Sequence, residues 1–188
     1  MHLLTLVWYR LNFVAGFREL ASSKQRRETL WALGMGHLLV QATFLPVTLT
    51  IPSVAEYFGV DIDDAAWSVI IRLLVLGSTV FLAARLGERY GHVRLFVIGA
   101  VIMSLGNLMA TTSQTLGQLI LWSGIGGLGG ALITANANAM LTMVFNMDER
   151  GRAFSVPVTA SRIGTFIGVG LFGVFLHYLN WRWVFATS

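Results

Sequence analysis

Two arginines lie inside long apolar stretches and are the side chains best suited to act on a ligand there. Arg72 lies between Ala66 and Ala84, and Arg162 lies nine residues after Ala153. An arginine at mid-membrane costs about 2.5–3.5 kcal/mol on insertion scales, so it usually faces a cavity or a partner. No Asp or Glu lies within these stretches. We therefore expect the two arginines to attract an anionic substrate; the alternative for Arg72 is to reach the nearby outer surface.

Polar residues recur at helical spacing in four apolar stretches. The repeats are His37, Gln41 and Thr48; Ser68, Arg72 and Thr79; Thr134, Asn138 and Thr142; and Ser155, Thr159 and Arg162. A polar path through a membrane is lined by such helix faces, which meet near the midplane. The pattern predicts a substrate cavity with His37, Gln41, Thr48, Arg72, Asn138, Thr159 and Arg162 as candidate residues. The alternative is that the hydroxyls bond back to their own helices.

His37 within this set and Asn136 outside it need separate interpretations. His37 could titrate near neutral pH and relay protons, or it could be a core histidine bonded to a backbone carbonyl. Asn136 points away from Asn138 on a helix, so we expect it to bond a neighbouring helix instead.

The sequence offers no pattern for catalysis, a metal or a cofactor. The four histidines are far apart and there is no cysteine, so no metal-ligand cluster is expected. No P-loop is present. Gly124-Ile125-Gly126 lies inside an apolar stretch with no strand before it, so it does not predict a dinucleotide site. We expect a protein that is not an enzyme and binds no nucleic acid.

Composition places the chain in a membrane. Only 12% of its 188 residues are charged, 55% are hydrophobic and the mean hydropathy is +0.70, whereas soluble domains average about 25% charged residues. Five stretches are long enough to cross a hydrocarbon core. They run roughly over 31–51, 66–84, 95–110, 116–145 and 153–179, and a sixth begins at Val184-Phe185. We expect an all-α polytopic bundle over residues 30–188.

Basic residues predict the orientation. Arg10, Arg18, Lys24, Arg26, Arg27, Arg85, Arg89, Arg94, Arg150 and Arg152 fall on one side, ten of the 13 basic residues. Arg182 alone falls on the other side, whose first loop is acidic. The positive-inside rule then places the N-terminus in the cytoplasm of a plasma or inner membrane. Residues 1–29 form a cytoplasmic or interfacial segment, in which 1–17 suits a helix at the membrane surface.

Glycines are dense in the fourth and fifth stretches. Gly124, Gly126, Gly127, Gly129 and Gly130 crowd the fourth. Small residues in a membrane let helix backbones approach closely, so we expect tight helix packing at these positions.

Three motifs then point to a family. After the second stretch comes a charged turn, which we define as Leu86, Glu88, Arg89, Gly91 and Arg94. Glu149-Arg150-Gly151-Arg152-Ala153 precedes the fifth stretch. Gly164, Gly168 and Gly173 punctuate the fifth stretch, and Trp181-Arg182-Trp183 follows it. In order and spacing these resemble the major facilitator superfamily, in particular its fourteen-helix drug:proton antiporter branch.

The resemblance implies a mechanism and also marks departures from it. It implies alternating access by two six-helix bundles and proton-coupled efflux of a small organic molecule, drug-like or anionic. The motifs depart from the family at Thr43, Ser123, Val169 and Phe172, where the family carries Asp, Arg, Pro and Gly. We expect a fragment that needs a missing C-terminal bundle to transport. The alternative is a truncated, non-transporting relic or a membrane module that binds a partner.

Overall fold

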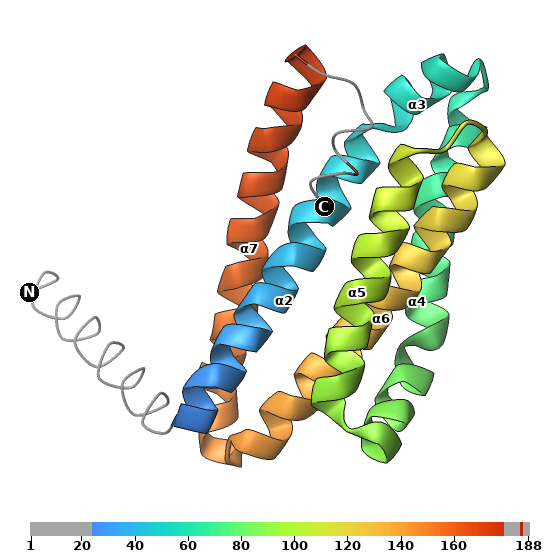
Figure 1. The fold of residues 1–188 in the computed structure, drawn as a ribbon. Helices are drawn as coiled ribbons and strands as arrows, with labels where there is room; N and C mark the ends of the chain where they lie inside the picture. The colour runs from blue at the N-terminus through green and yellow to red at the C-terminus, as the bar shows by residue number, and fades with distance from the viewer. Residues whose placement is uncertain (1–23, 179–184, 186–188) are drawn as a thin grey trace, which may run out of the picture.

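The computed structural model describes residues 24–178 and residue 185 (Figure 1). The helices are α2 (Lys24–Leu49), α3 (Ile51–Phe58), α4 (Ile62–Tyr90), α5 (His92–Thr111), α6 (Leu116–Val144) and α7 (Met147–Tyr178). The described part of the chain contains no strand. The all-α membrane bundle expected from composition is therefore confirmed. The expected surface helix over 1–17 and the Trp181-Arg182-Trp183 motif lie outside the described residues.

Each of the five expected spans corresponds to one long helix. α2, α4, α5 and α6 contain segments long and apolar enough to cross a membrane. α7 has 32 residues and therefore the length of a span, but it falls outside that set. Four of its first six residues are charged, namely Asp148, Glu149, Arg150 and Arg152, and Arg162 interrupts the rest.

The charged turn is shorter than its sequence suggests. α4 continues through Tyr90 and α5 begins at His92, so Gly91 alone joins the two helices. Gly91 has φ of 97°, a conformation that side-chain-bearing residues rarely adopt. Leu86, Glu88 and Arg89 thus lie in the last turns of α4, since Leu, Glu and Arg all favour helix.

The helices form two groups that are visible in Figure 1. α4, α5 and α6 pack closely together, and α7 packs almost entirely against α2. α2 joins the groups by also packing on α6. At this junction a Cβ on Gly36 would lie 2.7 Å from the Phe96 ring of α5 and 3.2 Å from Ile133 of α6.

Glycines bring the helices of each group into backbone contact. In the three-helix group, a Cβ on Gly127 would overlap the main-chain oxygen of Arg72, and a Cβ on Gly129 would overlap the main-chain nitrogen of Met103. In the α2–α7 pair, a Cβ on Gly164 would overlap the main-chain oxygen of Leu38. This is the close approach that small residues permit between membrane helices.

Candidate functional site

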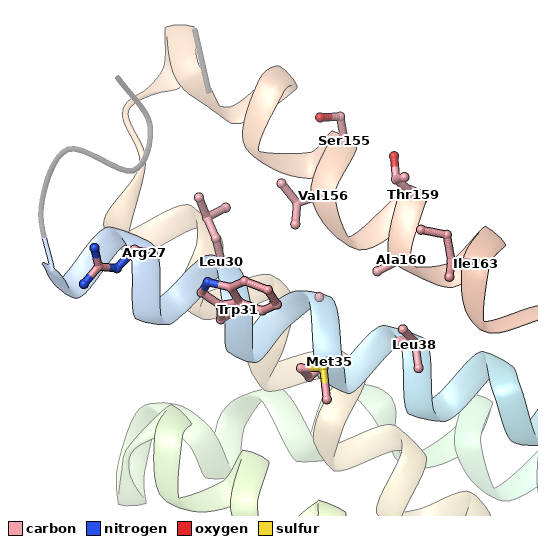
Figure 2. Close-up of a pocket in the computed structure, with 11 residues that line it drawn as sticks. Arg27, Leu30, Trp31, Met35, Leu38, Ser155, Val156, Thr159, Ala160 and Ile163 are labelled. Atoms are coloured by element: carbon pink, nitrogen blue, oxygen red, sulfur yellow. The ribbon is translucent and has the colours of Figure 1, made fainter. Parts of the chain in front are cut away.

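An apolar groove that bears Thr159 of the predicted set lies between α2 and α7 (Figure 2). Its volume is about 540 Å³. Its walls include Trp31, Met35 and Leu38 from α2, and Val156, Thr159 and Ile163 from α7, with Arg27 at one end.

Local sequence explains why the two helices open here. Gly164 and Gly168 press against the backbone of α2 at Leu38 and Ala42. Nearer the start of α2, Gly34 instead meets the side chain of Val156, 3.7 Å from a Cβ placed on it. The backbones of α2 and α7 are therefore in contact at the two α7 glycines, whereas a side chain lies between the helices at Gly34.

The groove combines a large apolar wall with one cation. Trp31 is 68% exposed and Met35 is 50% exposed, so both side chains are open to a ligand. Trp offers a flat apolar surface, and Met adapts to varied shapes. Arg27 is exposed beside them (Figure 2). Such a site can hold a flat apolar molecule and attract a polar or anionic end of it.

The structure does not bring the seven predicted cavity residues into one cavity. Thr159 lines the groove and is exposed, whereas Arg162 is exposed on the side of α7 away from Gly164. Asn138 is half-buried on α6. Arg72 is buried between α4, α5 and α6, where its Nη2 donates to Asn107 Oδ1.

The polar residues of α2 are half-buried and partly bonded within their own helix. His37 Nδ1 lies 3.1 Å from the carbonyl oxygen of Leu33, and Thr48 Oγ1 donates to Phe44 O at 3.0 Å. Gln41 is half-buried between them. Elsewhere, four more hydroxyls donate to carbonyls of their own helices, those of Ser68, Thr79, Thr142 and Ser155. These hydroxyls therefore follow the alternative given above, in which each one bonds to the backbone of its own helix.

Near the charged turn, the structure reveals a buried hydrogen-bonded group that the motif did not single out. Asn136 Nδ2 donates to Leu132 O at 2.8 Å and to Ala83 O of α4 at 3.3 Å. Its Oδ1 therefore accepts from His92 Nδ1, at 2.9 Å. A Cβ on Gly87 would overlap this Asn136 oxygen, so glycine is required there. The expected bond from Asn136 to a neighbouring helix is confirmed.

The motif residues of the charged turn surround this buried group. Leu86 is half-buried against the cluster of Ala83 and Leu95. Glu88, Arg89 and Arg94 are exposed, and the Arg89 guanidinium lies 5.4 Å from the Tyr90 ring centroid.

The Glu149–Ala153 motif lies in the first turns of α7 and takes part in contacts among three helices. Arg26 Nη1 of α2 lies 3.0 Å from Glu149 Oε1 of α7, and the Arg26 guanidinium stacks on Phe145 at 5.5 Å. Arg150 donates to Thr142 O at 2.7 Å and to Phe145 O at 3.2 Å, which satisfies carbonyls at the end of α6.

Two of the three glycines of the α7 motif pack against a neighbouring helix. Gly164 and Gly168 form the contact with α2, and Gly173 lies further along the same helix. No group of three or more potential metal ligands occurs within residues 24–178 and 185.

Long apolar helices packed through glycine are those of a polytopic membrane protein. Residues 31–188 match the family model of the Major Facilitator Superfamily, and the chain belongs to that superfamily. Its members are transporters.

Several named relatives are similar over most of this chain. A multidrug resistance protein of Mycobacterium tuberculosis is 29% identical over 85% of the chain and 30% of the relative. A puromycin resistance protein of Streptomyces alboniger is 29% identical over 78% of the chain and 29% of the relative. A riboflavin transporter of Clostridioides difficile is 25% identical over 73% of the chain and 30% of the relative. The chain thus spans less than a third of the length of these relatives.

Proposed function

We propose that this chain forms the N-terminal bundle of a secondary transporter that exports a small organic molecule, drug-like or anionic. The α2–α7 groove carries this proposal, because it joins an exposed Trp31 and Met35 to the cation of Arg27. The names of the relatives, which include multidrug resistance and puromycin resistance proteins, support the same substrate class.

The mechanism proposed is alternating access. Two bundles rock about a shared midplane site, so the groove needs a second, C-terminal bundle to close it. Thr159 and the exposed Arg162 are proposed to face this path. His37 is the candidate proton relay. The transporter proposed is therefore an antiporter that exchanges protons for the exported molecule. His37, Gln41, Thr48 and Asn138 are proposed to line the path where the second bundle completes it.

The proposed location is the plasma or inner membrane with the N-terminus in the cytoplasm. Ten of the 13 basic residues favour this orientation. The charged turn then lies at the cytoplasmic face, where Glu88, Arg89 and Arg94 are free to meet the second bundle.

The test is efflux by the transporter that contains this bundle together with its second bundle. Puromycin, riboflavin and an anionic fluorescein ester serve as probes in cells energised by a proton gradient. Trp31→Ala should raise KM for the exported probe about tenfold, equivalent to about 1.4 kcal/mol of lost contact. Phe81→Ala on α4 is the matched control, because Phe81 is 81% exposed and does not line the groove.

Collapse of the proton gradient should stop efflux if protons drive it. Equal changes in KM for Trp31→Ala and Phe81→Ala would show that the groove is not on the substrate path. Absence of efflux of every probe by a folded, membrane-inserted transporter would favour the non-transporting module.

A further inference from the structure

Arg72 is a buried cation whose charge nothing in the surrounding helices balances. Only 6% of its surface is exposed. Arginine stays protonated in proteins, so the charge is present. Its Nη2 donates to the neutral Asn107, and the apolar stretches of α4, α5 and α6 contain no Asp or Glu. A buried cation without a counter-charge is strongly disfavoured in a low-dielectric environment.

The polar atoms left over in the same layer are donors. Arg72 Nη1, Asn107 Nδ2 and Ser123 Oγ are buried and make no hydrogen bond within the described chain. The first two can only donate, and the hydroxyl of Ser123 also carries a proton to give. Ser123 lies one helical turn before Gly127, the residue that packs on the Arg72 backbone. Of these three residues, Arg72 is the one that lines the cavity described next, so its charge and its unbonded Nη1 are what would favour an anion there.

A small cavity opens directly beside Arg72. Its volume is about 20 Å³. Apart from Arg72 its wall is made of apolar side chains and glycines, namely Val40, Phe44, Leu73, Leu76, Met103, Gly126, Gly127 and Gly130. A water molecule needs about 10–15 Å³ by this kind of measure, so the space suits one water-sized or slightly larger particle. It is far too small for a drug-like molecule.

We propose that this cavity binds one small inorganic anion, of the size of chloride, as a fixed counter-charge for Arg72. Arg72 supplies the charge, while the glycines of α6 keep the space open. Val40 and Phe44 of α2 cover the site, so the anion links α2 to the three-helix group. The anion is a bound component of the bundle and not its exported substrate, and the proposal is therefore independent of the proposed efflux.

Halide-dependent stability of this chain tests the site. The chain is placed in nanodiscs of phosphatidylcholine, and its unfolding is followed by tryptophan fluorescence in sodium chloride, sodium bromide or sodium gluconate at equal ionic strength. Chloride and bromide should raise Tm saturably, by about 5 °C at a hundredfold excess over Kd, and the bulky gluconate should not. Arg72→Gln should abolish the halide shift.

Two further variants keep the test decisive. Arg85→Gln removes an exposed arginine from the same helix and should leave the halide shift intact. Gly130→Ala retains Arg72 but adds a methyl group that fills the cavity. A Cβ there would lie 3.3 Å from the flexible Leu76 Cδ1, so the bundle should still fold. Gly130→Ala should therefore lose the halide shift even if Arg72→Gln does not fold.

Three results would overturn the proposal. Equal Tm in chloride and gluconate for the unsubstituted chain would mean that the cavity holds water or nothing. A full halide shift in a folded Gly130→Ala or Arg72→Gln chain would place any anion elsewhere. An equal loss of the shift in Arg85→Gln would mean that general surface charge causes it.

Discussion

The α4–α5–α6 group and the α2–α7 pair both pack through glycine, but the first buries polar residues and the second leaves a groove. Both bring a glycine of one helix onto the backbone of another, Gly127 on Arg72 and Gly164 on Leu38. In the three-helix group, α6 is in close contact with both α4 and α5, and the group buries several of its polar residues. In the pair, α7 packs beside α2 and touches little else (Figure 1). A groove lies between these two helices.

The two groups differ in whether their polar residues are buried or are open to a ligand. Arg72, Asn107, His92 and Asn136 are all buried in the three-helix group and bonded in pairs. On α7, Thr159 and Arg162 are exposed. A helix held on both sides provides a rigid frame, and a helix held on one side leaves a face for a ligand or a second bundle.

The largest expected effect is at the seam of the three-helix group. Gly127→Ala places a methyl group on the Arg72 carbonyl, and α6 cannot move away from α4 because α5 packs on its other side. We expect a loss of about 3 kcal/mol in stability, the upper part of the usual range for overpacking. Denaturation in mixed micelles measures it.

Gly117→Ala is the control for this substitution. Gly117 is on the same helix, and a Cβ there would meet nothing within 4 Å. Because alanine favours helix more than glycine, Gly117→Ala should be neutral or slightly stabilising. A loss as large in Gly117→Ala as in Gly127→Ala would show that the seam does not set the cost.

A smaller effect is expected at the seam of the pair. Gly164→Ala would also overlap a backbone oxygen, that of Leu38, but α7 is free to shift outward. We expect a loss of about 1–2 kcal/mol, with Gly170→Ala on the same helix as the unaffected control. The same denaturation series gives both values. An equal loss of stability in Gly164→Ala and Gly127→Ala would show that α7 is no freer to shift than α6.

The helices themselves were predictable, because each apolar stretch long enough for a membrane became one long helix. The helix break at Gly91 and the glycine packing along α6 also follow from residue type. Asn136 could be assigned to a neighbouring helix because helical spacing turns it away from Asn138.

The candidate site was much less predictable, because spacing shows which residues share a face and not what that face meets. Arg72 shares a stripe with Ser68 and Thr79, yet the stripe packs into α5 and α6 instead of an open path. Trp31 and Met35 carry no polar signal, and they line the groove because of how α7 packs against α2. The burial of Arg72 and the position of Trp31 and Met35 in the groove both depend on contacts between helices that are far apart in the sequence.

The smallest expected effect concerns the ion pair that closes the pair of helices at one end. Arg26 and Glu149 connect the starts of α2 and α7 at 3.0 Å, with side chains 23% and 31% exposed. A double-mutant cycle with Arg26→Gln and Glu149→Gln should give a coupling of about 0.5–1 kcal/mol, which falls as salt is raised. The Lys24–Glu28 pair, 3.9 Å apart and mostly exposed, is the control and should couple less. If the two cycles gave the same coupling at every salt concentration, Arg26–Glu149 would not fasten α7 to α2, and the glycine seam alone would hold the pair.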